Sequence, residues 1–298
     1  MEIGVSIPHI GKLASPKFVR EFCVAAEEAG FGGLWGLDHM VMPHHTDSLY
    51  TLATSPTAIA DDAVSGLLSP NYEMMTTLAW VAGFTNRIKL GTAVAVLPIR
   101  NAVANARQLA TLDVYSGARV VYGVGVGWLR EEADAMGMPW DHRGRRSEEH
   151  IALLRALWTA EGDLVEFHGD YHDVPPIDPE PRPVQRPIPI LIGGHSEAAL
   201  DRAGRIGDGW IAAAMSPERL ATHWDAVRAA AERHGRDPAS LVLHTGVSRS
   251  VTRPRAETVE EYASLGVDHL HLSATRDDEH ETMTELERLA REVVPAIR

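Results

Sequence analysis

The chain has 298 residues, of which 45% are hydrophobic and 23% charged, as is typical of a globular protein and not of a disordered one. Its formal net charge of −13, without any basic stripe, disfavours nucleic acid and anionic membranes as partners and favours small molecules. Cys23 is the single cysteine, which excludes an intrachain disulfide and suits a reducing compartment. No apolar run is long enough to span a membrane and no signal peptide is recognisable, so we expect a cytoplasmic protein.

The N-terminal part alternates strands with helices. An apolar strand over residues 3–7 is followed by a helix with a capping hydroxyl at Ser15 and a proline in its first turn, and Gly30 ends this helix. A second strand runs over residues 33–37. The next segment, 40–71, has no clear period, and loops of this length are commonly functional lids or disordered.

The stretch 87–128 defines the fold best. It contains a buried strand over 88–97, a helix over 101–114 and a second buried strand over 118–124. A strand, helix and strand in this order require a parallel sheet with a right-handed crossover. Ligands bind such sheets where the strands end.

The rest of the chain repeats this unit. After residue 127 the pattern lapses until a helix over 147–158, which is followed by a hairpin around 167–171 and a proline-rich run over 175–189. Further strands, each followed by a helix, are expected over 190–192, 209–213, 241–247 and 267–272. With a helix over 72–84, the count reaches the eight strand–helix units that close a barrel. We therefore predict an α/β fold, a (β/α)8 TIM barrel forming a single domain over 1–298, with insertions after strands two and four (40–71 and 128–189).

One candidate anion site follows the fifth strand. Gly193, Gly194, His195 and Ser196 lie between a strand and a helix N-terminus, where free backbone amides and the helix dipole suit a phosphate. The alternative, that these glycines only make a tight turn, is equally compatible with the residues.

The glycines of the fourth strand do not form a dinucleotide fingerprint. Gly123, Gly125 and Gly127 would need a further glycine at position 128 or 130, where Trp128 and Arg130 stand. A Rossmann site is therefore disfavoured, and we expect these glycines to let a flat ligand lie close to the backbone.

Histidines supply the other candidate groups. His39 follows Asp38 at the end of strand two, which suits a general acid or base, although a structural histidine is the commoner outcome. His269 and His271 face one way on the last strand and could join a zinc site, but no later strand end offers an acidic partner. A polar inner layer is the favoured interpretation, and we expect no metal.

Three arginines begin the helix after the lapse. Arg143, Arg145 and Arg146 could clamp an acidic ligand tail, whereas a solvated helix start is the default interpretation.

Four stretches, taken together, resemble a known family. They are AAEEAGFGGLWGLDHMVMP (25–43), RIKLGTAVAVLPIRN…QLATLDVYSGARVVYGVGVGWLREE (87–132), RGRRSEEHIALLRALWT (143–159) and QRPIPILIGGHSEAALDRAGRIGDGW (185–210). They are similar to the luciferase-like monooxygenase superfamily, and more narrowly to its branch of oxidoreductases that depend on the deazaflavin coenzyme F-420.

The resemblance implies a barrel that holds a flavin or deazaflavin face-on at the strand ends. Asp38 and His39 match the family's strand-two pair, so both are expected to be catalytic; the histidine would handle protons during hydride transfer, and the aspartate is also expected in the cofactor site. Ala93 and Val94 match a bulge in strand three that backs the ring, often through a non-prolyl cis peptide bond.

Other matched positions concern the phosphate and the substrate. Gly194, His195 and Ser196 match the phosphate-binding turn, and Gly125, Gly127 and Gly193 are expected beside the cofactor. The substrate pocket is expected to include Trp128, Glu131 and His271.

Two departures bear on the substrate. Sugar-phosphate dehydrogenases of the family have an acid where Trp128 stands here and a hydroxyl where Val96 stands, so a sugar phosphate is disfavoured and a more apolar pocket is expected. Glu131 and Glu132 could replace the missing acid or could cap a helix.

The resemblance implies a homodimeric oxidoreductase that uses F-420 to move a hydride to or from a small organic substrate. Two alternatives remain open. One is a two-component monooxygenase that uses reduced FMN and oxygen and is supplied by a separate flavin reductase. The other is a non-catalytic flavin-binding protein.

Overall fold

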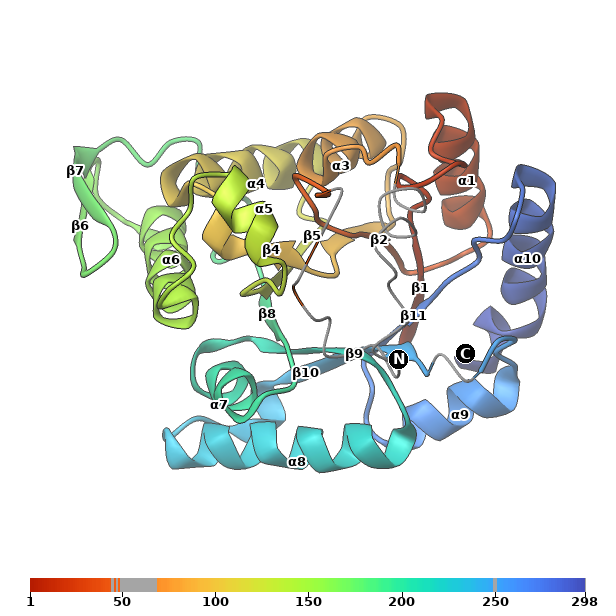
Figure 1. Cartoon of the computed structure of the whole chain (residues 1–298). Helices are drawn as coiled ribbons and strands as arrows, with labels where there is room; N and C mark the ends of the chain where they lie inside the picture. Colours follow the sequence, from red (N-terminus) through yellow and green to blue (C-terminus); the bar gives the residue numbers. More distant parts are fainter. Residues whose placement is uncertain (44–45, 47, 49–68, 249–250, 298) are drawn as a thin grey trace.

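The computed structural model describes residues 1–43, 46, 48, 69–248 and 251–297 (Figure 1). Among these residues, eight parallel strand positions close into a barrel with helices outside it, which confirms the predicted (β/α)8 TIM barrel. The barrel strands are β1 (Glu2–Ser6), β2 (Gly33–Gly36), β3 (Lys89–Thr92) with its continuation β4 (Ala95–Val96), β5 (Val120–Gly125), β8 (Ile190–Gly193), β9 (Gly209–Met215), β10 (Val242–Val247) and β11 (His269–Leu272).

The helices of the described residues surround this barrel (Figure 1). They are α1 (Pro16–Glu28), α3 (Met74–Ala82), α4 (Ala102–Ser116), α5 (Arg130–Ala135), α6 (Arg143–Thr159), α7 (Glu197–Ile206), α8 (Pro217–Arg233), α9 (Ala256–Ser264) and α10 (Glu279–Glu292), with short 3-10 turns η1 (Leu97–Ile99), η2 (Pro238–Ser240) and η3 (Val294–Ile297). An antiparallel hairpin of β6 (Val165–His168) and β7 (Asp173–Ile177) stands outside the barrel at the left of Figure 1. Within this part of the chain, no helix is both long and apolar enough to cross a bilayer.

Local signals set most helix ends as expected. The Ser15 hydroxyl accepts a hydrogen bond from the backbone amide of Phe18, which caps α1. Asn101 caps α4 in the same way, and Gly117 ends that helix with a φ of 71°, a conformation that glycine adopts without a steric cost.

The structure divides one predicted strand and adds one helix that was not predicted. The strand expected over 88–97 is divided into β3 and β4 by a cis peptide bond between Ala93 and Val94. The helix α5 was not predicted, because its six residues are too few to show a hydrophobic period. α6 packs against α4 as one of the outer helices. The predicted insertion 128–189 is therefore divided in the sequence into a segment before α6 and a segment after it.

The barrel interior has an aromatic layer. Trp35 is 1% exposed, and its indole Nε1 donates a hydrogen bond of 3.0 Å to Nε2 of His269. The ring of His271 stacks on Trp35 with the centroids 3.9 Å apart, and the ring of His244 meets Trp35 edge-on. A Cβ on Gly91 would lie 2.1 Å from the Trp35 ring, so this glycine makes room for the indole. The predicted polar inner layer is therefore present.

Candidate active site

The site is built where β2, β4, β5 and β8 end, which is where barrel enzymes place their reactive groups. Asp38 and His39 follow β2, and the bulge at Ala93 and Val94 lies between β3 and β4. The turn before α7 follows β8. Strand pairing brings these segments together, because β4 pairs with β5 and β5 pairs with β8.

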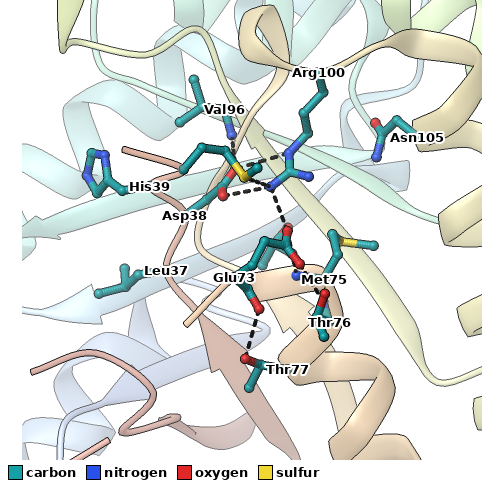
Figure 2. Close-up of polar contacts among 12 residues, drawn as sticks. Leu37, Asp38, His39, Glu73, Met75, Thr76, Thr77, Val96, Arg100 and Asn105 are labelled. Carbon is teal, nitrogen blue, oxygen red and sulfur yellow. Dashed lines mark hydrogen bonds and ion pairs between the residues drawn. The ribbon is translucent and has the colours of Figure 1, made fainter. Parts of the chain in front are cut away.

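Asp38, just after β2, forms a buried ion pair with Arg100. Its carboxylate accepts hydrogen bonds from Nη2 of Arg100 at 2.7 Å and from the backbone amide of Val96 at 2.8 Å (Figure 2). Nη2 of Arg100 also lies 3.4 Å from the Glu73 carboxylate. Burial lowers the pKa of Arg100, but the charges of Asp38, Tyr122 and Glu73 and the hydrogen bond to Asp38 together outweigh it, and the net shift is upward.

This geometry corrects the expected catalytic role of Asp38. Its side chain has no exposed surface, and both carboxylate oxygens are engaged by Arg100 and Val96. Asp38 thus joins the end of β2 to the start of η1 instead of facing a ligand. Figure 2 shows the imidazole of His39 pointing away from this network.

His39 is held from several sides by described residues, which bond to only one of its ring nitrogens. Its Nδ1 lies 3.1 Å from Oε2 of Glu132, and its side chain is 16% exposed. The Trp128 ring meets the imidazole edge-on with the centroids 5.9 Å apart, and the Asn71 amide donates to the His39 carbonyl at 2.6 Å. Among the described residues nothing hydrogen-bonds to Nε2, so this atom is the one that can exchange a proton with a ligand.

The two glutamates of α5 accept hydrogen bonds from the chain that follows β2. Oε1 of Glu132 accepts hydrogen bonds from the backbone amides of Met40 at 2.6 Å and Val41 at 3.2 Å. Glu131, expected in the substrate pocket, accepts hydrogen bonds from the hydroxyl of Ser48 at 2.6 Å and from its amide at 3.2 Å. Most of the predicted lid, 49–68, lies outside the described residues.

The glycines of β5 and β8 make room for the bulge. A Cβ on Gly125 would lie 2.8 Å from Cγ2 of Val94, and one on Gly193 would lie 3.1 Å from Cγ1 of the same side chain. Likewise a Cβ on Gly127, at a φ of 77°, would lie 2.9 Å from Val96. Gly125 and Gly127 were expected to let a flat ligand lie close to the backbone, and Gly193 was expected beside the cofactor. The structure shows that the space at their Cα atoms is filled by the valines of strand three.

The turn before α7 has the form expected for an anion site. Gly194 has a φ of 104°, and the Ser196 side chain caps α7 by accepting from the amide of Ala199. Gly194 and Ser196 are exposed, and His195 is partly buried. Burial and the nearby charge of Arg219 lower the pKa of His195, so its ring is neutral near pH 7.

His271 lies at the aromatic layer, where the sequence predicted a pocket residue. Its Nε2 is buried and has no hydrogen-bond partner in the described chain, and burial holds its pKa well below the ordinary value. No group of three histidine, cysteine or acidic side chains in the same ranges could hold a metal ion.

The arginines that begin α6 form no ion pair with any described residue. The guanidinium of Arg143 lies 4.1 Å from the centroid of the Trp140 ring, and that of Arg146 lies 5.2 Å from that of Tyr171. α6 runs alongside α7 in the same direction, since Glu148 pairs with Arg202 and Arg155 with Asp208 near the end of α7. The two helix N-termini therefore lie at the same end of the barrel.

Comparison with known proteins decides the family. A family model described as luciferase-like monooxygenase matches residues 1–293. The chain belongs to the luciferase-like monooxygenase family. Members of this family are oxidoreductases and monooxygenases, which agrees with the resemblance seen in the sequence.

Three curated relatives illustrate the range of this family. An uncharacterized protein of Mycobacterium tuberculosis is 37% identical over 196 residues, which are 66% of this chain and 65% of that protein. An FMNH(2)-dependent dimethylsulfone monooxygenase of Pseudomonas putida is 38% identical over 168 residues, 55% of this chain and 46% of that one. A phthiodiolone/phenolphthiodiolone dimycocerosates ketoreductase of Mycobacterium tuberculosis is 29% identical over 286 residues, 84% and 70% of the two chains. The match to the first relative thus spans slightly less than two thirds of its length.

Solved structures share the barrel of this family. An F-420-dependent secondary alcohol dehydrogenase, in complex with an F-420–acetone adduct, has a TM-score of 0.78 at 18% identity and covers 100% of this chain and 99% of its own. A monooxygenase from Streptomyces bottropensis has a TM-score of 0.77 at 21% identity, with both chains covered to 100%. At these identities the similarity shows the fold.

Proposed function

We propose that the protein transfers a hydride between the deazaflavin coenzyme F-420 and a small organic substrate, a carbonyl compound or the matching alcohol. The observation that carries this proposal is His39 at the end of β2, whose Nδ1 bonds to Glu132 and whose Nε2 has no hydrogen-bond partner among the described residues. The ketoreductase relative supports it, because reduction of a ketone is the same class of reaction.

The proton balance explains why the histidine matters. When bound, the coenzyme would supply or accept the hydride. A carbonyl that gains a hydride becomes an alkoxide and needs a proton, and an alcohol that loses a hydride must release one. The Nε2 atom of His39 would donate the proton in the first direction and accept it in the second.

The residues present fit a flavin or deazaflavin. The cis bulge at Ala93 and Val94 offers an apolar side chain at the strand ends, and Gly125 and Gly193 keep it in place. The turn from Gly194 to Ser196 would hold the phosphate at the N-terminus of α7, where amides and helix dipole attract an anion. Trp128, beside His39, would contact the substrate.

The test is equilibrium binding of F-420 and of FMN to the purified protein, followed side by side by fluorescence. Tight binding of F-420 alone, followed by reduction of a carbonyl panel with reduced F-420, would support the proposal. A preference for FMN, or no carbonyl turnover with bound F-420, would overturn it.

A second candidate is a two-component monooxygenase that receives reduced FMN from a separate flavin reductase. The observation that favours it is the 38% identity to the FMNH(2)-dependent dimethylsulfone monooxygenase. Oxygen consumption with reduced FMN, coupled to incorporation of labelled oxygen into a product, would identify this activity.

A further inference from the structure

Glu132 is a buried acid without a cationic partner in the described chain. It is 2% exposed, and no arginine or lysine pairs with it there. Among the described residues, the donors that reach its carboxylate are the backbone amides of Met40 and Val41 and the ring of His39. A buried carboxylate needs such donors, so each of the three contacts bears on its charge.

The hydrogen bonds to the Glu132 carboxylate determine the tautomer of the His39 imidazole. An ionised carboxylate can only accept hydrogen bonds, and the two backbone amides occupy Oε1. Oε2 must therefore accept from Nδ1 of His39, which places the hydrogen of a neutral ring on Nδ1 and leaves a lone pair on Nε2.

We propose that Glu132 is a positioning residue that holds His39 in the Nδ1–H tautomer and directs Nε2 toward the reacting atoms. Only the second half of this statement rests on the proposed function. The carboxylate also fixes the chain next to the histidine through Met40 and Val41, so tautomer and ring position are set by one group.

The neighbours of the ring leave little freedom for another arrangement. Trp128 meets the imidazole at an interplanar angle of 85°, and Asn71 ties down the His39 carbonyl. When Nε2 takes up a proton, the imidazolium has the Glu132 carboxylate at 3.1 Å to stabilise it.

The first test needs neither cofactor nor substrate. Nitrogen-15 NMR of the imidazole above pH 7 distinguishes Nδ1–H from Nε2–H, and we expect His39 to be Nδ1–H in the unmodified protein. In Glu132→Gln the amide can donate to Nδ1, so the tautomer should shift toward Nε2–H. The matched control is Glu131→Gln, which alters the neighbouring side chain and should leave the tautomer unchanged.

Kinetic measurements test the second part of the proposal, that Glu132 directs Nε2 of His39 toward the reacting atoms. With a substrate found for the enzyme, Glu132→Gln should lower kcat by about 10²-fold with little change in KM, as expected for loss of acid–base catalysis. Glu132→Asp keeps an acceptor of the same charge, so its kcat should lie between that of Glu132→Gln and that of the unmodified protein. An Nε2–H tautomer in the unmodified protein would overturn the proposal even if Glu132→Gln did not fold. An unchanged tautomer in a folded Glu132→Gln would overturn it too, and neither result depends on whether F-420 is the coenzyme.

Discussion

The guanidinium of Arg100 spans the carboxylate of Asp38, with Nη2 2.7 Å from Oδ1 and Nε 3.2 Å from Oδ2. Both side chains are almost fully buried, so loss of one charge leaves the other unpaired in the interior. We expect Asp38→Asn to destabilise the protein by about 3–5 kcal/mol, measured by urea unfolding.

The control for that substitution is an ion pair on the surface. Lys17 and Glu21 lie 3.9 Å apart and are both exposed, so Lys17→Ala should change the free energy of unfolding by less than about 1 kcal/mol. Equal effects of the two substitutions would show that the buried pair does not hold the end of β2.

The contact between Gly125 and Val94 predicts a compensating pair of substitutions. A Cβ at position 125 would lie 2.8 Å from Cγ2 of Val94, so Gly125→Ala should displace the bulge and weaken cofactor binding by about tenfold or more. Val94→Ala removes the clashing methyl, and the double variant should bind the cofactor better than Gly125→Ala alone. Additive losses in a double-mutant cycle would contradict this account.

The inner histidines predict a loss of stability in acid. Burial lowers the pKa of His244 from 6.5 to about 3, and burial also lowers those of His269 and His271. Between pH 6.5 and 3 the unfolded chain therefore binds protons that the folded chain does not, so stability is complete above this window and falls as pH decreases through it. Each histidine can contribute a slope of up to about 1.4 kcal/mol per pH unit.

The measurement is urea unfolding at several pH values from 7 to 4. His244→Gln should make the dependence on pH shallower, whereas His280→Gln, at an exposed position, should leave it unchanged. A slope that is the same in all three proteins would show that His244 does not titrate on unfolding.

The arginines at the start of α6 predict a preference for anionic ligands. Arg143 and Arg146 lie against aromatic rings without a carboxylate partner in the described ranges. Replacing both with alanine should weaken binding of the phosphorylated coenzyme about tenfold or more and should affect its dephosphorylated form much less. Arg228→Ala is the control, since Arg228 pairs with Asp225 on α8. If the double variant lost the same affinity for both forms of the coenzyme, the arginines would have a structural role and would not contact the phosphate.

The fold was predictable because the strands and the ends of helices such as α1 and α4 depend on a few adjacent residues. Ser15, Asn101 and Gly117 act within one helical turn, and the apolar strands are continuous runs. The position of the site at the strand ends follows from the same pattern. The cis bond at Ala93 was expected from the family resemblance and not from any local signal.

The partners of the site residues were not predictable, because they depend on contacts between distant segments. Arg100 lies 62 positions from Asp38, and Glu132 lies 93 positions from His39. Nothing near Asp38 in the sequence shows that a buried arginine pairs with its carboxylate. An acid next to a histidine therefore predicts a catalytic pair. Glu132 was noticed as an acid after the fourth strand, but its link to His39 requires the barrel to be closed.

The last pairing that closes the barrel joins Glu2 through Val5 of β1 to His269 through Leu272 of β11. On the ribosome, β1 is synthesised before all the other barrel strands, so its second neighbour, β11, exists only after the strands between them have been made. Until then one edge of β1 presents unpaired backbone groups to other chains. The nascent protein should therefore depend on holding factors until β11 has been made, and a message cut before β11 should yield an aggregating product instead of a smaller folded one.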